Sequence, residues 1–394
     1  MKRHLSVLAL IPALLGADSA LEMPVEATPE AGLVRGIADL REARSEQALG
    51  RIDTVLKDKP AFQLARLVRG DLLMVRGGIL QKFGNALPAA KVDPLRQEAK
   101  ARVARYVDSV WKKGVPSYFL EYPSEVRSAI LVDIKRSRLF FYKRENSGWR
   151  LDSDWYTSSG RLTGEKRTEG DERTPLGVYT VQTAVPKDKL TDFYGSGAYP
   201  LDYPNAWDRL KKRGGHGIWI HGSPTNTYSR PPRASGGCVV LTNPDFEALG
   251  KKLEPGKTPV VVADGAQWVD PTVLDKSRRE LLESVEAWRK AWESRDVDRY
   301  LAWYGSSFKS GAGQSLSDWE MQKRKVNAGK SWITVKLASL SAVVVPESMP
   351  LVQVEFQQDY RSNNLENNMK KRQYWKREEG HWRIIYEGDP DGKR

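Results

Sequence analysis

The chain has 394 residues, of which 40% are hydrophobic and 13 are tryptophan, so it can bury two or three domain cores and is not a disordered protein. Its formal net charge of +13 favours an anionic partner, although lysine and arginine spread over a solvated surface give the same total. Helices followed by strands, twice along the chain, predict a multi-domain α+β protein.

Residues 1–20 predict a secretory signal peptide. Lys2 and Arg3 precede the apolar run 5–15, and small residues follow at 16–20. The run is shorter than the about 20 residues that span a bilayer, and an uncleaved interfacial anchor is the alternative. We therefore expect export across the inner membrane to the periplasm and cell envelope. Export argues against nucleic acid as the anionic partner and favours a cell-wall polymer or a membrane surface.

Residues 25–120 predict a helical accessory region. Apolar residues recur at helical spacing over 48–56 and 64–73, and Pro60 separates the two runs. A further helix is expected over 94–111. The first two helices faintly resemble one tetratricopeptide-type unit, but a single copy does not make a repeat array.

Residues 126–265 predict a mostly-β domain. The β-rich runs 129–133 and 138–142 flank a short polar turn and predict a hairpin, which the run 149–158 extends by a third strand. A strand over 258–263 closes the domain after a short helix over 244–252.

Cys238 is the only cysteine of the chain and forms a candidate catalytic pair with His221. The thiolate is the most nucleophilic side chain near neutral pH, and a histidine within reach can take its proton. Gly236 and Gly237 leave room for a substrate and let backbone N–H groups converge as an oxyanion hole requires. One cysteine cannot form an internal disulfide, so in an exported protein it favours a reactive thiol.

Two other interpretations of the pair stay open. A single cysteine is often a small buried hydrophobe, and a lone histidine is often a satisfied core residue. A metal site of His216, His221 and Cys238 would have an unusual ligand spacing and no second cysteine. We expect no metal and no cofactor.

The residues around this pair resemble the L,D-transpeptidase (YkuD-type) catalytic domain. The resemblance covers about residues 126–265, and it rests on His221-Gly222, on Ser235-x-Gly237-Cys238-Val239-x-Leu241, on Ser159-Gly160 and on Gly170-Asp171-x-x-Thr174-Pro175-x-Gly177-x-Tyr179. It implies cleavage of the bond between diaminopimelate and D-alanine in peptidoglycan stem peptides, through a thioester on the cysteine. By this resemblance Cys238 is the nucleophile, His221 the general base and the Gly222 carbonyl the group that holds the imidazole, while the N–H groups of Gly237 and Cys238 form the oxyanion hole.

Two positions depart from the family pattern. Many members carry histidine or arginine where this chain has Gly236, and arginine where it has Val240. The missing arginine resembles the divergent branch with L,D-carboxypeptidases of cell-shape determination and enzymes that release lipoproteins from peptidoglycan. Arg230 and Arg233, in the segment between base and nucleophile, are candidates to bind a substrate carboxylate in its place. The other candidate substrate-binding residues are Ser235, Gly236, Tyr199 and Tyr203.

Residues 276–394, after a polar linker, predict an α+β accessory domain. Its tryptophans and tyrosine at helical spacing resemble a nuclear-transport-factor-2-like (SnoaL-like) cone, a fold that often has a pocket and often forms dimers. No convergent acid–base set lies within it, so we expect binding or homodimerisation rather than a second enzyme.

The favoured function is therefore a cysteine L,D-transpeptidase that acts on peptidoglycan stem peptides in cell-wall remodelling. Hydrolysis at the same cysteine and histidine, by an L,D-carboxypeptidase or a lipoprotein-releasing amidase, is the first alternative. An inactive cell-wall binding protein is the second.

Overall fold

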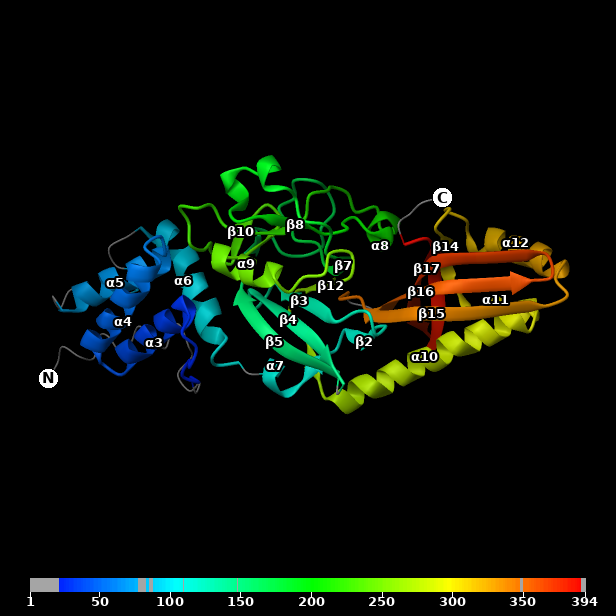
Figure 1. The fold of residues 1–394 in the computed structure, drawn as a ribbon, viewed down its shortest axis with the longest axis horizontal. Coiled ribbons are helices and arrows are strands. Elements are labelled where there is room, and N and C mark those ends of the chain that lie inside the picture. The colour runs from blue at the N-terminus through cyan, green and yellow to red at the C-terminus, as the bar shows by residue number, and fades with distance from the viewer. Residues whose placement is uncertain are drawn as a thin grey trace.

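The computed structural model of the chain places three parts in a row (Figure 1). The N-terminal part is helical, the middle part is mostly β, and the C-terminal part is α+β, so the predicted multi-domain α+β fold class is confirmed. The predicted signal peptide lies outside the described residues, which are 21–76, 83–84, 88–108, 110–146, 148–347 and 350–390.

The N-terminal helices pack around one apolar core. Gly32 and Gly36 let the first helix approach the second closely, because a Cβ at these positions would meet Val55 and Ile52 at 2.6 and 2.8 Å. The expected helix over 94–111 is wrong at both ends, because one helix covers Ala89–Ala104 and a separate short helix begins at Val110. Arg105, just after the first helix, binds a carboxylate of the middle domain through its guanidinium. The helices are α3 (Pro29–Arg41), α4 (Ser45–Asp58), α5 (Gln63–Arg76), α6 (Ala89–Ala104) and α7 (Val110–Lys113).

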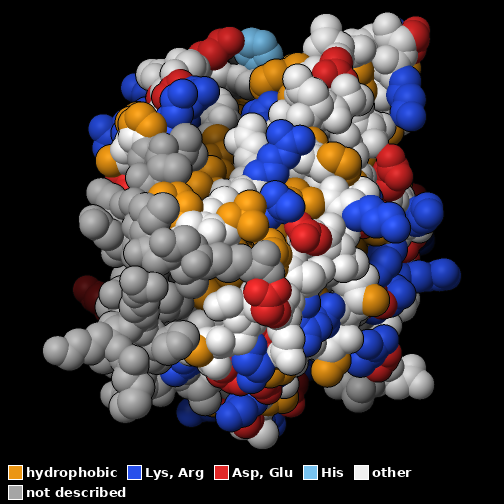
Figure 2. All heavy atoms as spheres, turned by 90° about the vertical axis from the view of Figure 1, so that its left-hand side faces the viewer, with side chains coloured by type: hydrophobic (Ala, Val, Ile, Leu, Met, Phe, Trp, Pro, Cys, Tyr) orange, Lys and Arg blue, Asp and Glu red, His pale blue; other side chains and the backbone are white. Residues whose placement is uncertain are grey.

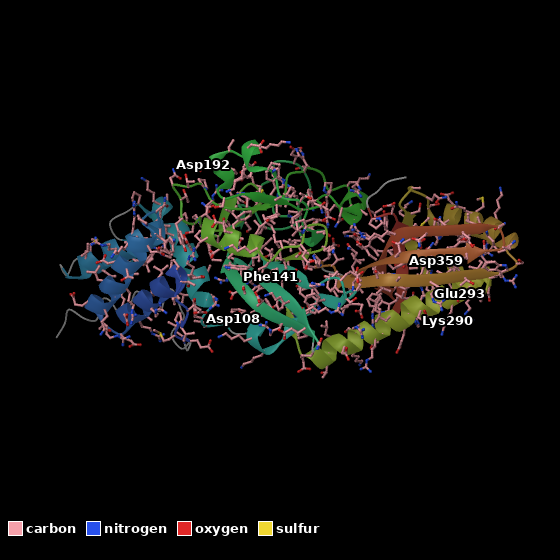
Figure 3. All side chains as sticks on the ribbon, in the orientation of Figure 1. Asp108, Phe141, Asp192, Lys290, Glu293 and Asp359 are labelled. Carbon is pink, nitrogen blue, oxygen red and sulfur yellow. The ribbon has the colours of Figure 1, made fainter. Side chains whose placement is uncertain are left out.

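The middle domain is built on a five-stranded sheet of order β5-β4-β3-β12-β7. The predicted hairpin and third strand are confirmed, and β12 lies parallel to β3. Phe141 of β4 lies inside this domain and is fully buried (Figure 3). The strands are β3 (Ser128–Asp133), β4 (Arg138–Glu145), β5 (Gly148–Tyr156), β7 (Gly177–Thr180) and β12 (Pro259–Ala263).

A layer of short strands packs on this sheet and carries the candidate site. Ile220 and Val239 of that layer share one buried apolar core with Ile130, Val132 and Val262 of the sheet. The layer has a three-stranded sheet of order β11-β9-β8 and the pair β10-β6. Its elements are β6 (Ser159–Gly160), β8 (Ala198–Pro200), β9 (Trp219–His221), β10 (Arg233–Ser235), β11 (Val239–Val240) and the helices α8 (Ala206–Leu210) and α9 (Asn243–Gly250).

The C-terminal domain wraps a six-stranded sheet, of order β14-β18-β17-β16-β15-β2, with α10 along one side (Figure 1). Strand β2 (Phe119–Glu121) comes from before the middle domain and pairs with β15, so the prediction of a purely helical region up to residue 120 is wrong there. Phe119 is buried among Tyr122, Tyr142 and Trp149, which explains why this segment leaves the helices. The other elements are β1 (Val115–Pro116), β13 (Trp268–Val269), α10 (Pro271–Glu293), α11 (Val297–Leu301), β14 (Tyr304–Ser310), α12 (Leu316–Ala328), β15 (Ile333–Val344), β16 (Leu351–Ser362), β17 (Leu365–Glu378) and β18 (His381–Gly388).

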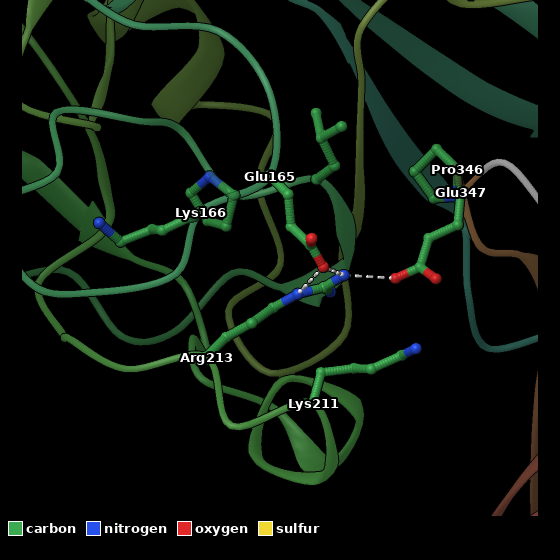
Figure 4. A pocket seen from close by; sticks show the side chains of 8 residues that line it. Glu165, Lys166, Lys211, Arg213, Pro346 and Glu347 are labelled. Atoms are coloured by element: carbon green, nitrogen blue, oxygen red, sulfur yellow. Dashed lines mark hydrogen bonds and ion pairs between the residues drawn. The ribbon is translucent and has the colours of Figure 1, made fainter.

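Arg213 joins the middle domain to the C-terminal domain. Its guanidinium binds Glu165 at 2.5 Å and Asp208 at 3.2 Å within the middle domain, and Glu347 at 2.7 Å beyond it. Arg213, Glu165 and Glu347 border a cavity of about 310 Å³ between the two parts (Figure 4). Trp207 adds a hydrogen bond from its indole N–H to Glu347.

The positive charge is not gathered in one patch on the helical end of the molecule. Figure 2 shows lysine and arginine there spread among acidic and hydrophobic side chains. Within the part of the chain that the structure describes, no helix is long and apolar enough to cross a membrane.

A buried ionic cluster joins the helices to the middle domain, and we expect it to set their joint stability. Asp154 binds Arg105 at 2.8 Å and also binds Arg138. Burial alone would raise the pKa of Asp154, but the two guanidinium groups hold it below its usual value. The stabilisation is therefore complete above about pH 4 and is lost as the pH falls towards the lower folded-state pKa.

Asp154→Ala leaves two buried guanidinium groups without this partner and should cost about 3–5 kcal/mol at pH 7. The measurement is the midpoint of urea unfolding. Asp53→Ala is the matched control, because Asp53 binds Arg69 at 2.6 Å with its side chain 46% exposed, and it should cost less than about 1 kcal/mol. Equal shifts in the two variants would contradict a dominant role of the buried cluster.

Candidate active site

Parallel pairing of β9 with β11 brings His221 and Cys238 to one place. Val240 lies opposite His221 and Val239 opposite Ile220. Cys238 directly precedes β11, and its thiol donates to the Gly217 carbonyl just before β9, so the cysteine lies beside the segment that carries His221. The base thus lies on β9, and the nucleophile lies directly before the adjacent strand β11.

The imidazole of His221 is fully buried and has one fixed tautomer. Its Nδ1 lies 2.7 Å from the Gly222 carbonyl, which can only accept, so Nδ1 carries the proton. Nε2 is buried and has no hydrogen-bond partner among the described residues, and in this tautomer it is the acceptor. Burial lowers the pKa of His221 to about 4, helped by the charge of Arg230 and opposed by the Gly222 hydrogen bond. The ring is therefore neutral at pH 7.

Two aromatic rings that the sequence did not single out enclose this imidazole. The centroids of Phe193 and Tyr194 lie 5.7 and 5.1 Å from that of His221. Asp192, at the outer edge of the middle domain (Figure 3), accepts a hydrogen bond from the Thr225 N–H and ties this corner to the segment after the base. The sequence offers no signal for these two residues, because they lie in a loop rich in glycine and tyrosine and belong to no motif.

Asn243 holds the turn after His221, and it too was missed by sequence reasoning. Its Oδ1 accepts hydrogen bonds from the N–H groups of Ser196, at 2.9 Å, and Ser223, at 3.1 Å. A Cβ at Gly222 would lie 2.2 Å from the same oxygen, so only glycine fits beside the base.

Cys238 is partly exposed, and its thiol donates to the Gly217 carbonyl at 3.4 Å. Burial raises the pKa of the Cys238 thiol above its ordinary value, although the Trp219 N–H and the charges of Arg230 and Lys166 oppose this. The sulfur is thus protonated at neutral pH and needs a base to become a nucleophile.

Ser235 shapes the turn that carries the cysteine. Its hydroxyl donates to the Cys238 carbonyl at 2.6 Å and accepts from the Gly237 N–H at 3.1 Å. Ser235 is buried, whereas Gly236 is exposed with open space around its Cα. Of the two predicted oxyanion donors, the Gly237 N–H is therefore already bound to Ser235 in this structure, which sequence reasoning did not foresee.

The second motif builds the wall beside the cysteine. Asp171 binds Lys166 at 2.6 Å and accepts backbone N–H groups of its own loop, and despite burial these contacts lower its pKa to about 2. Thr174 accepts a hydrogen bond from the Gly160 N–H at 2.9 Å. Gly237 has φ +134°, and a Cβ there would lie 2.9 Å from the Arg173 carbonyl. The glycine therefore lets this loop press against the cysteine turn.

The two candidate arginines lie in different places. Arg230 stacks on Phe193, with its guanidinium carbon 4.8 Å from the ring centroid, and its charge acts on both His221 and Cys238. Arg233 is exposed and lines a separate groove of about 630 Å³ between α6 and the middle domain. Only Arg230 therefore joins the site.

The expected placement of Tyr199 and Tyr203 in the cleft is wrong. Tyr199 pairs with Ile220, on the face of β9 opposite to His221, and its ring packs on Phe246. Tyr203 is buried, and its hydroxyl donates to the Gly214 carbonyl at 2.7 Å. Both rings hold loops onto the core.

Among the described residues, no group of three or more histidine, cysteine, aspartate or glutamate side chains could hold a metal ion. His216 is exposed and lies 3.4 Å from Glu169 rather than beside Cys238. The chemistry available to the site is that of a thiol, a neutral imidazole and one guanidinium.

Comparison with known families and structures agrees with this geometry. The family model of the L,D-transpeptidase catalytic domain (YkuD) matches residues 127–262, and that of the Cds6 C-terminal NTF2-like domain matches residues 280–388. No curated protein matches the chain.

Two solved structures cover most of the chain. Bd1075 from Bdellovibrio bacteriovorus is 27% identical with a TM-score of 0.60, over 70% of this chain and 97% of its own. Pgp2 from Campylobacter jejuni, described as a helical cell shape determining protein, is 24% identical with a TM-score of 0.61, over 71% of this chain and 97% of its own. The chain thus contains an L,D-transpeptidase (YkuD) catalytic domain at residues 127–262 and a Cds6-type NTF2-like domain at residues 280–388.

Proposed function

We propose that the chain cleaves the bond between diaminopimelate and D-alanine in peptidoglycan stem peptides, through a thioester on Cys238. The observation that carries this proposal is the buried Nε2 of His221, which has no hydrogen-bond partner among the described residues and lies on the strand next to the segment that follows Cys238. A buried nitrogen without a partner costs free energy unless a substrate or a reacting proton uses it. The fixed Nδ1 proton leaves this nitrogen as the only acceptor of the ring.

The reaction follows from these two groups. Nε2 of His221 takes the Cys238 proton, and the sulfur attacks the carbonyl carbon of diaminopimelate. The carbon–nitrogen bond to D-alanine then breaks, and the departing amine receives the proton from the imidazolium. We assign stabilisation of the oxyanion to the N–H groups of Cys238 and Gly237. The Gly237 N–H would then leave the Ser235 hydroxyl and donate to the substrate oxygen instead.

We favour water over an amine as the second acceptor, which makes the chain an L,D-carboxypeptidase. Val240 is buried beside His221, where many family members carry an arginine, so this site departs from the pattern of those members. The resemblance of the sequence, which lacks this arginine, to the branch with L,D-carboxypeptidases supports the same choice. Transfer to an amine, the prediction made from sequence, is the alternative.

The substrate also gives the proposed location. Stem peptides lie in the cell envelope, so we propose export to the periplasm by residues 1–20. Homodimerisation through the C-terminal domain, and contact of the basic surface with an anionic polymer or membrane, stay predictions.

The products of purified protein on digested peptidoglycan test the proposed reaction. We expect tetrapeptide muropeptides to become tripeptides with release of D-alanine, and Cys238→Ala to abolish the change. Mass spectrometry of the muropeptides is the measurement. New diaminopimelate-linked dimers would overturn hydrolysis in favour of transfer, and unchanged muropeptides would contradict the proposed function altogether.

His221→Ala should lower the turnover by at least about a hundredfold, because general-base catalysis contributes about 10²–10⁴. In the unmutated protein, alkylation of Cys238 by iodoacetamide should rise steadily above pH 7, since thiol and imidazole are both neutral there. The exposed His381 of β18 gives the control variant His381→Ala, which should change neither quantity. A rate of alkylation that is already maximal at pH 6 would indicate a thiolate–imidazolium pair and contradict this account.

Arg230→Ala should lower kcat/KM by about 10- to 100-fold through KM, because a charge-assisted hydrogen bond contributes about 1.5–3 kcal/mol. Arg233→Ala is the matched control three residues away, and it should leave kcat/KM unchanged. Steady-state kinetics on a tetrapeptide substrate decide between them. A larger effect at Arg233 than at Arg230 would refute the assignment of the carboxylate site.

A further inference from the structure

The segment between base and nucleophile, residues 225–233, is anchored on the N-terminal helices; we call it the flap. The ring of Tyr228 lies 4.6 Å from that of Phe62 and packs against the core of the helical part. The next residue, Ser229, donates its hydroxyl to Glu98 of α6 at 2.7 Å. Both contacts join the flap to helices that lie far from it in the sequence.

A buried chain of side chains continues from this anchor to the next residue of the flap. Glu98 also accepts a hydrogen bond from Arg102 Nε at 2.9 Å, and both side chains are almost fully buried. The guanidinium carbon of Arg102 lies 3.9 Å from the ring centroid of Tyr156, at the end of β5. The Tyr156 hydroxyl donates to the backbone carbonyl of Arg230 at 2.8 Å.

Arg230 depends on this support because no carboxylate holds its side chain. Among the described residues it makes no ion pair, and its guanidinium rests on the exposed ring of Phe193. A free arginine side chain loses about 2 kcal/mol of rotamer entropy when it is ordered. If the Arg230 backbone is already fixed, less conformational entropy is lost when an anion binds the guanidinium. The position of the Arg230 carbonyl therefore affects how strongly this side chain can bind an anion in the site.

We propose that the N-terminal helices are a positioning element of the active site, in which Glu98 and Arg102 of α6 act with Tyr156 of β5 to fix the flap so that Arg230 stays beside Cys238. Tyr156 and Glu98 touch neither substrate nor sulfur, and they act through the flap. The inference rests on the proposed function only for the carboxylate that Arg230 binds. The positive charge of Arg230 beside the sulfur of Cys238 can be measured without any substrate.

Alkylation of Cys238 by two reagents reports that charge. Iodoacetate is an anion and iodoacetamide is neutral, so the ratio of their rates measures the positive charge near the sulfur, while any change in thiol pKa affects both alike. Cys238 is the only cysteine, so the mass of the intact protein follows the reaction. Tyr156→Phe removes the hydrogen bond to the Arg230 carbonyl and keeps the ring under Arg102.

We expect Tyr156→Phe to lower the iodoacetate-to-iodoacetamide ratio at least about threefold, towards the value of Arg230→Ala. Tyr142→Phe is the matched control, because Tyr142 is equally buried on the neighbouring strand but its hydroxyl bonds the Trp268 indole N–H at 2.7 Å. Ser229→Ala removes the other anchor and should act in the same direction as Tyr156→Phe. In the Arg230→Ala background, Tyr156→Phe should change the ratio no further.

A ratio unchanged in both Tyr156→Phe and Ser229→Ala would overturn the inference. So would an equal fall in Tyr142→Phe, or a further fall in the double variant, because either result would mean that the hydroxyl acts on general stability and not through Arg230. If the unmutated protein does not cleave muropeptides but the alkylation ratio falls in the variants as expected, only the proposed reaction is refuted. If the protein cleaves muropeptides but the ratio does not change in the variants, only the positioning role is refuted.

Discussion

The pairing of two very short strands, β9 and β11, is the constraint on which the rest of the site depends. It sets the histidine and the segment that begins at the cysteine side by side, and it requires the chain to make two tight turns, one after His221 and one before Cys238. Glycine occupies both turns because a Cβ would collide with Asn243 in the first and with the Arg173 carbonyl in the second. Burial then gives the pair its chemistry, since it keeps the imidazole neutral and the thiol protonated until a substrate arrives.

The parts on either side of the middle domain are tied to it by buried charge. On one side Asp154 of β5 binds Arg105 after α6, and on the other Arg213 bridges Asp208 to Glu347. Removing one partner of such a buried ion pair strongly destabilises the protein, because the other charge stays buried without compensation. Strand β2 also links the middle and C-terminal domains, because it precedes the middle domain in the chain but pairs with β15 of the C-terminal sheet. The flanking parts therefore form a frame around the catalytic layer.

Sequence patterns predicted the fold class because apolar periodicity marks helices and strands, as in the hairpin of β3 and β4. They also singled out Cys238 and His221 as the candidate pair, because the neighbours of these residues form a specific motif. They could not separate Arg230 from Arg233, because only the path of the flap turns one towards the cysteine. Tyr199 and Tyr203 were misplaced because a loop tyrosine looks the same whether it lines a cleft or packs on a core. Strand β2 was missed because its partner lies more than 200 residues further along the chain.

The central claim is that the sulfur of Cys238 carries the peptide during the reaction. Brief mixing of the protein with a stem tetrapeptide, followed by acid quenching and intact-mass spectrometry, tests it most directly. The account predicts an adduct with the mass of the tripeptide acyl group, on the peptide that contains Cys238. Release of D-alanine without such an adduct, and at an equal rate when Cys238 is replaced by alanine, would contradict it.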